Sequence, residues 1–278
     1  MLQLRRDRDT NEHRNRNKDD MSEKGIGDIR KELQAAAEEL LPDFIAEYEK
    51  DERAGVQALV AQAGKRLEKL KAEKQRIWEL GRFEREYASF GYVCGIDEVG
   101  RGPLAGPVVA GAVILPEDCD ILYINDSKQL SEKKREELYD VIMEQAVAVG
   151  IGMVGPARID EINILQATYE AMREAIGKLR VRPDILLNDA VTIPGVTIRQ
   201  VPIIKGDAKS ISIGAASIVA KVTRDRMMVE YDKLMPEYGF ASNKGYGAAA
   251  HIEALKKYGP SPIHRASFIK NFITVPEQ

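Results

Sequence analysis

The chain has few cysteines and no long apolar run. Cys94 and Cys119 are its only cysteines in 278 residues, which excludes a framework of several disulfides. No stretch approaches the roughly 20 apolar residues that a membrane-spanning helix needs, and the N-terminus lacks the apolar segment of a signal peptide. We therefore expect a protein of the reducing cytoplasm that does not contact a membrane.

The chain also lacks an excess of either charge. Lys and Arg number 41 and Asp and Glu 44, for a net charge of −3, which argues against a strongly basic coat that binds nucleic acid without specificity. A local basic groove remains open, because the basic residues need only be unevenly placed. With 44% apolar residues, the chain can bury a core as one large domain or as one domain with an appendage.

Several common catalytic motifs are missing as well. The sequence contains no Ser-His-Asp set, no dinucleotide fingerprint and no phosphate-binding loop of the required spacing. His251 and His264 lack the spacing of a zinc site, so we expect them to be structural or to lie near a phosphate. His13 lies in a charged N-terminal stretch and is not expected to be a ligand.

Composition separates three regions. Residues 1–20 are mostly charged and polar, and we expect a disordered tail or an over-extended start, with Met21 as the true first residue. Residues 21–86 predict an N-terminal helical extension in three segments, with a break at residues 41–43 and a third segment over 65–83. Residues 87–278 alternate strands and helices, which predicts a layered α/β domain with a C-terminal helical part.

Expected elements follow from apolar periodicity. We expect strands over residues 92–97, 108–115, 146–154, 185–187 and 197–204. Helices are expected over residues 131–144, 158–179, 209–234 and 249–258. The third segment of the extension carries basic residues that either form a solvated face or touch phosphates: Lys65, Arg66, Lys69, Lys71, Lys74 and Arg76.

Two adjacent carboxylates, Asp97 and Glu98, stand at the end of an apolar run and directly before a Gly-Arg-Gly turn. Carboxylate oxygens are the ligands that Mg²⁺ and Mn²⁺ prefer. On an ideal strand the two side chains would point to opposite faces, so the strand must end, twist or bulge for both to reach one site. Arg101 offers a planar set of donors for a phosphate or a sugar hydroxyl. The alternative is an acidic strand end followed by an ordinary turn.

Two further carboxylates fall at the ends of predicted elements. Asp189 ends the apolar run at residues 185–187, where it is either a metal ligand or part of an Asx turn. Asp207 precedes a long helix, so it is an N-cap, an active-site residue or both. Carboxylates brought together repel one another, and divalent cations make such a cluster tolerable near neutral pH.

The stretch Gly95–Pro107 (GIDEVGRGPLAGP) closely resembles the signature of the ribonuclease HII family. Other segments match the family in order: residues 125–130 (NDSKQL), Asp189 after its strand, residues 203–210 (IIKGDAKS), residues 242–247 (SNKGYG) and residues 259–265 (GPSPIHR). The resemblance covers about residues 91–268. We interpret residues 125–130 as a capping turn before a helix, with a phosphate contact as the alternative.

This resemblance implies a ribonuclease H-like mixed sheet flanked by helices, after a small all-helical extension of the kind that some bacterial members carry. It implies an endonuclease that hydrolyses the RNA strand of RNA–DNA hybrids and cuts 5′ of single ribonucleotides embedded in duplex DNA, leaving a 5′-phosphate and a 3′-hydroxyl. Two Mn²⁺ or Mg²⁺ ions, about 4 Å apart, are implied at the catalytic and metal-binding residues Asp97, Glu98, Asp189 and Asp207.

The resemblance also implies how RNA is told from DNA, which rests on the 2′-hydroxyl. It assigns this contact to Gly100, Arg101 and Gly102 together with Tyr246, whose flanking glycines expose the ring. Ala248 stands where the family usually has a threonine, and Asn188 where it usually has an apolar residue. We expect a monomer that contacts a DNA-clamp or repair protein in addition to its substrate.

Other functions were weighed against this one. A non-catalytic hybrid-binding protein would not need the four acids, and a nuclease of the same fold that acts on all-DNA substrates, such as a resolvase, would not need the sugar-sensing residues. The related ribonuclease HIII is disfavoured by the Gly-Arg-Gly turn at residues 100–102 and by the absence of a strand-rich pattern in the N-terminal region.

Overall fold

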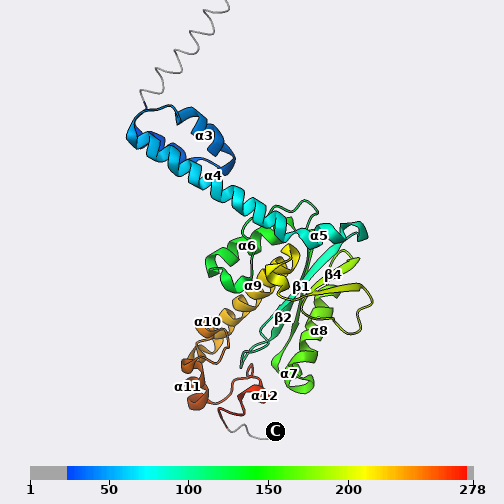
Figure 1. Cartoon of the computed structure of the whole chain (residues 1–278). Coiled ribbons are helices and arrows are strands. Elements are labelled where there is room, and N and C mark those ends of the chain that lie inside the picture. The colour runs from blue at the N-terminus through cyan, green and yellow to red at the C-terminus, as the bar shows by residue number, and fades with distance from the viewer. Residues whose placement is uncertain (1–23, 274–278) are drawn as a thin grey trace, which may run out of the picture. The chain divides into compact units, whose positions relative to one another are not determined.

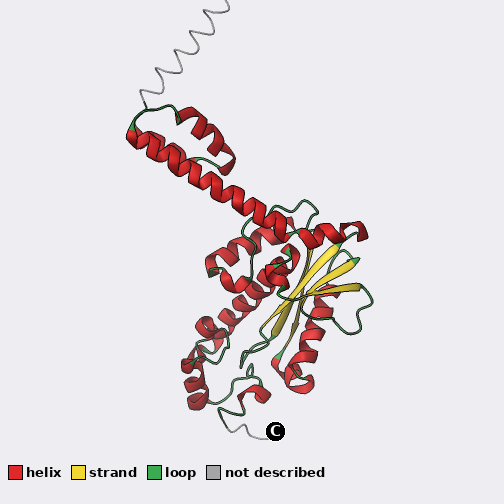
Figure 2. Cartoon of the chain, in the orientation of Figure 1, coloured by secondary structure: helices red, strands yellow, loops and turns green. Residues whose placement is uncertain are grey.

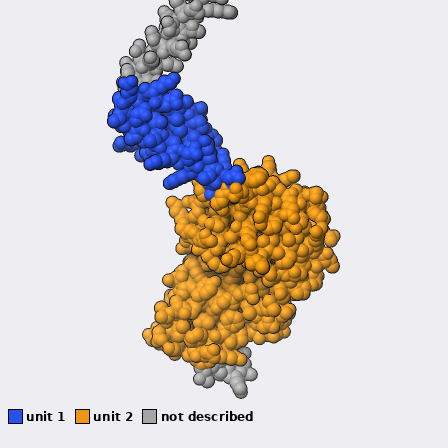
Figure 3. Space-filling model, in the orientation of Figure 1, with its two compact units in different colours: residues 1–75 blue, residues 76–278 orange. Residues whose placement is uncertain are grey.

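The computed structural model describes residues 24–273. The charged tail at residues 1–20, His13 and Met21 therefore lie outside the described residues. The chain forms two compact units, which divide between residues 75 and 76 (Figure 3). This division falls within one helix, and the domain boundary predicted between residues 86 and 87 stays a prediction.

The first unit is helical (Figure 1). Its elements are α2 (Ile26–Ala35), the 3₁₀ turn η1 (Glu38–Leu40), α3 (Leu41–Tyr48) and most of α4 (Ala54–Leu80). Apolar side chains of these helices form its core: Ile29, Leu33, Leu41, Phe44, Tyr48, Val56, Leu59 and Ala63. Pro42 stands in the first turn of α3, where its missing N–H costs nothing.

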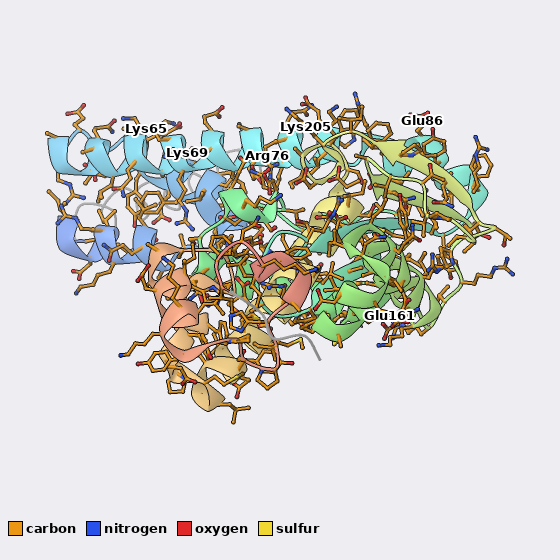
Figure 4. The ribbon with its side chains drawn as sticks, turned by 90° about the horizontal axis from the view of Figure 1, so that it is seen from below. Lys65, Lys69, Arg76, Glu86, Glu161 and Lys205 are labelled. Carbon is orange, nitrogen blue, oxygen red and sulfur yellow. The ribbon has the colours of Figure 1, made fainter. Side chains whose placement is uncertain are left out.

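The second and third predicted segments of this extension are one helix. The prediction of separate segments was wrong. The apolar stripe continues through Leu67 and Leu70, and α4 contains no proline or other break before it ends ahead of Gly81. Lys65 and Lys69 project from α4 (Figure 4). Arg66 donates to a backbone carbonyl of α2, so the basic residues of this helix do not all belong to a solvated face.

A five-stranded mixed sheet forms the centre of the second unit (Figure 2). The strands are β1 (Val93–Val99), β2 (Val108–Ile114), β3 (Ala148–Val154), β4 (Ile185–Asp189) and β5 (Arg199–Ile203), in the order β3-β2-β1-β4-β5. β2 is antiparallel to both β1 and β3, whereas β4 is parallel to both β1 and β5. The five expected strands are confirmed to within a few residues, and with them the predicted fold class.

Helices cover both faces of this sheet. The longer helices of this unit are α5 (Arg82–Tyr87), α6 (Glu132–Gln145), α7 (Pro156–Ile162), α8 (Ile164–Gly177), α9 (Ile211–Leu234) and α11 (Ala249–Tyr258), of which α6, α8 and α9 pack on the sheet. Shorter turns are η2 (Ala88–Phe90), η3 (Ser127–Gln129), η4 (Gly206–Ala208), η5 (Pro236–Tyr238), α10 (Phe240–Asn243) and α12 (Ala266–Ile269). Val113 packs with α6 and α9, while its neighbour Ala112 packs with α8. Because side chains alternate along a strand, these helices lie on opposite faces.

Two glycines let α9 lie close to the central strands. A Cβ on Gly95 would lie 2.1 Å from the backbone carbon of Ser212, and one on Gly111 would lie 2.5 Å from the carbonyl oxygen of Ala216. Both distances are shorter than real contacts, so only glycine fits at these positions. The close packing brings the start of α9 over the part of β1 that carries Asp97.

The helix expected over residues 158–179 is interrupted at Asn163. This residue has a φ of 66°, and its side chain accepts hydrogen bonds from the N–H groups of Leu165 and Gln166, at 3.0 and 3.2 Å. Asn163 therefore caps α8, and the prediction of a continuous helix was wrong because the periodicity does not reveal a capping asparagine. Across residues 24–273, no helix combines the length and the apolar character needed to cross a membrane.

Candidate active site

Asp97 and Asp189 follow the last paired residues of two neighbouring parallel strands, although β1 itself continues along β2 to Val99. In the register of β1 and β4, Ile96 lies opposite Asn188, so the next residue of each strand is one of the two aspartates. Equivalent positions on parallel strands point to the same face of a sheet. The sheet therefore brings together two acids that lie far apart in the sequence.

Asp97 is buried, with 6% of its surface exposed. Its Oδ1 accepts a hydrogen bond from the N–H of Glu98 at 2.8 Å, and Ser217 of α9 also bonds to the carboxylate. Burial raises the pKa of Asp97 well above its usual value, and the nearby carboxylates of Glu98 and Asp189 raise it further, whereas the hydrogen bonds to Ser217 and to the N–H of Glu98 lower it. Asp97 thus lies in a place that disfavours its charge.

Glu98 faces the arginine of the glycine turn. Its Oε1 lies 3.3 Å from Nη1 of Arg101. Burial raises the pKa of Glu98 and Asp189 adds to this effect, while Arg101 opposes it. The charge of Asp189 therefore raises the pKa of both Asp97 and Glu98. The expected end, twist or bulge of the strand is absent here, because β1 continues in regular register through both acids, with Asp97 opposite Gly111 and Glu98 opposite Ala110.

Asp207 lies in η4, just before α9. It is not the N-cap of that helix, because the cap is Ser210, whose Oγ accepts from the N–H of Ile213 at 3.2 Å. Burial raises the pKa of Asp207, and so do the carboxylates of Asp126 and Asp189. Asp189 is tied to the same turn, since its Oδ1 accepts from the N–H of Gly206 at 2.7 Å.

The segment at residues 125–130 adds charges that the sequence analysis did not place at the site. Asp126 caps η3 by accepting from the N–H of Lys128 at 2.9 Å, which confirms the predicted capping turn. Burial acts to lower the pKa of Lys128, but Asp126, Asp97 and Asp207 outweigh it, so the pKa of Lys128 is raised. Oγ of Ser127 lies 2.9 Å from Oγ of Ser217, which extends the bonding around Asp97.

These acids share an environment, but they do not converge on one point. Within residues 24–273, no three His, Cys, Asp or Glu side chains form a group that could hold a metal ion as they lie. The donor set nevertheless fits a hard divalent cation, because it consists of carboxylate oxygens, and burial and neighbouring carboxylates raise the pKa of Asp97, Glu98 and Asp207. A bound cation would relieve the repulsion that Asp97, Glu98 and Asp207 experience.

Two buried arginines hold the turn that follows the acids. Arg224 of α9 donates to the carbonyls of Pro107 and Ala105, at 2.9 and 3.0 Å. Arg265 donates to the carbonyls of Gly100, Arg101 and Gly106. Both arginines are fully buried, and burial together with the neighbouring Arg224 lowers the pKa of Arg265 to about 9. The sequence analysis missed both; the only signal was the family-like segment that ends at Arg265.

The two glycines of the turn differ in their surroundings. Gly100 has a φ of 88°, and a Cβ there would lie 2.3 Å from Nε of Arg224. Gly102 is exposed, and a Cβ there would meet no atom within 4 Å. Gly100 is therefore required by the fold, whereas Gly102 leaves open backbone on the surface.

Tyr246 lies beside this turn. The carbonyl of Gly245 accepts from the N–H of Leu104 at 2.8 Å, and the guanidinium of Arg224 lies 5.8 Å from the centre of the Tyr246 ring. The ring is 42% exposed. The structure thus brings the sequence-predicted tyrosine next to the Gly-Arg-Gly turn, with an accessible face.

Asn188, the departure from the family pattern, has a specific partner. Its Nδ2 donates to Oε1 of Gln200 on β5 at 2.8 Å and to the carbonyl of Val191 at 3.1 Å. Gln200 in turn bonds to both backbone groups of Ile193. These bonds tie the loop after Asp189 to β5 and satisfy the amide nitrogen of the buried Asn188, whereas its Oδ1 is buried with no hydrogen-bond partner.

Residues near the end of the helical extension also support the site. Arg76 donates to the carbonyl of Ile124 at 2.8 Å, just before the segment that carries Asp126. Glu84 of α5 accepts from the hydroxyls of Ser210 and Ser212, and from the N–H of Ser212 at 3.1 Å. A carboxylate at this helix N-terminus satisfies unpaired donors and favours the helix dipole.

The fold and the site define a class: an α/β protein with a five-stranded mixed sheet and carboxylates near the ends of two neighbouring strands, a donor set that suits metal-dependent hydrolysis of phosphodiesters. Comparison with known proteins then gives the family. The model of the family "Ribonuclease HII" matches residues 94–271, and that of the "Ribonuclease HII N-terminal domain" matches residues 25–88. The chain belongs to the ribonuclease HII family and is a ribonuclease H endonuclease.

Named relatives agree with this assignment. The chain is 68% identical over 246 residues to a protein named Ribonuclease HII from Lachnoclostridium phytofermentans, a match that covers 88% of this chain and 97% of the relative. It is 54% identical over 245 residues to the Ribonuclease HII of Bacillus subtilis, covering 87% of this chain and 95% of that protein.

Solved structures show the same fold. The ribonuclease H2 of Pyrococcus horikoshii matches with a TM-score of 0.55 and 31% identity, over 65% of this chain and 96% of that one. A chain from the PCNA:RNase HII complex of Archaeoglobus fulgidus matches with a TM-score of 0.54 and 28% identity, over 66% of this chain and 98% of that one.

Proposed function

We propose that this endonuclease hydrolyses the RNA strand of RNA–DNA hybrids and cuts on the 5′ side of single ribonucleotides embedded in duplex DNA. The products are a 5′-phosphate and a 3′-hydroxyl. One arrangement carries the proposal: acids lie near the ends of the neighbouring strands β1 and β4. The Gly-Arg-Gly turn follows β1 directly and lies beside Tyr246. The acids suit phosphodiester hydrolysis, and the turn suits recognition of a ribose.

Asp97, Glu98, Asp189 and Asp207 would hold the divalent metal, Mn²⁺ or Mg²⁺. When two such ions are bound, they supply an activated water and stabilise the leaving oxygen. The chain's own part is to aim carboxylates from rigid strand ends and to keep Asp97 buried against Ser217. Lys128, within the field of these acids, is suited to contact a phosphate oxygen of the substrate.

The Gly-Arg-Gly turn and Tyr246 would recognise the ribonucleotide. Gly102 offers open backbone that a sugar can approach closely. Arg101 has a half-exposed side chain that can reach a phosphate or hydroxyl. The exposed ring of Tyr246 can stack on the sugar or base at the junction of RNA and DNA.

A sliding-clamp contact is proposed from similarity. The related Archaeoglobus fulgidus protein was solved in a complex with PCNA, and we propose that this chain likewise contacts a DNA clamp during repair. The monomeric state and the cytoplasmic location that the sequence suggests stay predictions.

The test uses a labelled DNA duplex with one ribonucleotide, a matched all-DNA duplex and a branched all-DNA substrate, each with Mg²⁺, Mn²⁺ or EDTA. The proposal is supported if the enzyme, in the presence of metal, cuts 5′ of the ribonucleotide and leaves both all-DNA substrates intact. Tight binding without any cut would favour a hybrid-binding protein, and preference for the branched substrate would favour a resolvase. Tyr246→Ala should raise KM for the single-ribonucleotide duplex by about tenfold, as loss of a stacking contact does.

A further inference from the structure

Two buried histidines lie behind Tyr246 and take no part in the chemistry described above. His251 of α11 and His264 are 0% and 6% exposed. Their Nε2 atoms are 3.0 Å apart, and Nδ1 of His251 lies 2.8 Å from the carbonyl oxygen of Tyr246. The pair therefore links the interior to the main chain of a residue that we place at the substrate.

The backbone sets the direction of these hydrogen bonds. Nδ1 of His264 lies 3.0 Å from the backbone nitrogen and 2.7 Å from Oγ of Ser261. Because a backbone N–H can only donate, Nδ1 must accept, and the hydroxyl of Ser261 then donates to it as well. In a neutral imidazole the proton is then on Nε2 of His264, from which it is donated to Nε2 of His251. The proton of His251 is then on Nδ1 and is donated to Tyr246. The chain runs one way, from Ser261 to the Tyr246 carbonyl.

The surroundings keep both rings neutral. Phe240 and Tyr238 pack against them, with ring centres 5.3 Å from His251 and 5.0 Å from His264. Burial lowers the pKa of His251, and burial together with the neighbouring His251 lowers the pKa of His264 to about 4. A second proton would set two N–H groups against each other across the short Nε2–Nε2 distance.

The same Tyr246 carbonyl closes a tight turn. It also accepts from the N–H of Ala248 at 2.8 Å, while the N–H of Tyr246 donates to Asn243 at 2.9 Å. The main chain is thus held from inside, whereas the ring remains accessible on the outside. Because the backbone of Tyr246 is already fixed, binding of a ligand to its ring costs little conformational entropy.

We infer that His251 and His264 are positioning residues whose one-way hydrogen-bond chain fixes the backbone of Tyr246 and so presents its ring to the ribonucleotide. The inference rests on the proposed contact of Tyr246 with the substrate. It gives a role to the pair that the sequence analysis could describe only as structural or phosphate-proximal.

A matched pair of variants tests this inference in the full chain. The amide nitrogen of Asn takes the place of a histidine Nδ1, whereas that of Gln takes the place of Nε2. His251→Asn therefore keeps a donor for the Tyr246 carbonyl, and His251→Gln loses it. Hydrogen exchange of the peptide that contains residues 244–250, followed by mass spectrometry, should quicken by about tenfold in His251→Gln, as expected for one lost hydrogen bond. His251→Asn should stay near the wild-type rate.

Kinetics on the single-ribonucleotide duplex give the second readout. His251→Gln should raise KM by about tenfold and leave kcat nearly unchanged, because the four acids are untouched, and His251→Asn should restore the wild-type KM. If His251→Gln does not fold, His251→Leu removes the donor to the Tyr246 carbonyl without placing a new amide in the interior, and it should loosen the same peptide in the same direction.

Unchanged exchange in His251→Gln, or in His251→Leu where that variant replaces it, would overturn the inference. So would quickened exchange with an unchanged KM, provided that Tyr246→Ala raises KM. If Tyr246→Ala also leaves KM unchanged, the proposed ribose contact itself is wrong, and the inference falls with it.

Discussion

At the end of β1, carboxylates lie close to other carboxylates; a few residues later, the carbonyls of the turn at residues 100–107 are met by guanidinium groups. In the first region, burial raises the pKa of Asp97, Glu98 and Asp207, and neighbouring carboxylates raise it further. In the second, Arg224 and Arg265 satisfy one carbonyl after another.

The two regions differ in whether their structure is complete before a ligand binds. The acid region is incomplete by itself and is suited to a cation that would neutralise it. The turn region is complete by itself, so its shape exists before the substrate arrives. The buried carboxylates therefore destabilise the folded protein when they are charged, whereas the hydrogen bonds of the turn stabilise it. Substitutions should therefore have opposite effects on stability in the two regions.

Asp97→Asn should show the largest effect. We expect cleavage to fall by roughly a thousandfold or more, because a metal-binding carboxylate is lost, with binding of an RNA–DNA hybrid retained. Because the folded protein raises the pKa of Asp97, its charged form costs stability near neutral pH, and Asn removes that cost while keeping the bond to the N–H of Glu98.

Single-turnover cleavage and thermal unfolding in EDTA measure these effects. The comparison predicts an inactive variant with a raised Tm. A variant that still cleaves at the wild-type rate would refute the metal-binding role of Asp97. A lowered Tm would refute the claim that the charged Asp97 side chain destabilises the folded protein.

Arg224→Lys should have the next largest effect, in the opposite sense. Lysine cannot reproduce the guanidinium bonds to Pro107, Ala105 and Lys244, so buried carbonyls lose their donors, at a cost of about 2–4 kcal/mol. Thermal unfolding should show a clearly lower Tm. Arg226→Lys is the control on the same helix, because Arg226 is half-exposed and its pair with Glu136 contributes about 1 kcal/mol or less. Equal effects of the two variants would contradict the comparison.

Substitutions at the two glycines of the turn should separate an effect on stability from an effect on substrate binding. Gly100→Ala forces a side chain into Arg224 at positive φ, so it should destabilise the protein by more than about 1 kcal/mol. Gly102→Ala meets only open space and should leave Tm unchanged, yet weaken binding of the hybrid because the backbone there is proposed to approach the sugar. Unfolding curves and a binding titration in EDTA distinguish these cases, and undiminished binding by Gly102→Ala would remove that glycine from the site.

Glu84→Ala should have the smallest effect. It removes the acceptor of the Ser210 and Ser212 hydroxyls at the start of α9, which should cost about 1–2 kcal/mol and lower kcat modestly by loosening the turn that carries Asp207. Glu86→Ala is the control on the same short helix, since Glu86 lies on the exposed surface (Figure 4) and should change stability by less than about 0.5 kcal/mol. Urea unfolding of both variants checks this, and equal stabilities would show that Glu84 does not support the helix.

Much of the site could be predicted from local patterns, and some of it could not. The apolar runs that end at Asp97 and Asp189 predicted strands with acids at their ends; β4 does end at Asp189, whereas β1 continues past Asp97 to Val99. The N-cap interpretation of Asp207 was wrong because Ser210, three residues later, competes for the same helix start. Periodicity detects an apolar stripe, but it does not decide which of several polar residues caps the helix.

The sequence by itself determined the ribonuclease H-like class, the acids at the strand ends and the glycine turn, because each is written in a short contiguous stretch. Only the tertiary structure decided which side chains complete them. Arg224 meets Pro107 across 117 residues and Arg265 meets Gly100 across 165, while the His251–His264 chain depends on two segments packed around aromatic rings. A buried polar group is satisfied by whichever donor the folded chain brings near it, and that donor is chosen by packing rather than by position in the sequence.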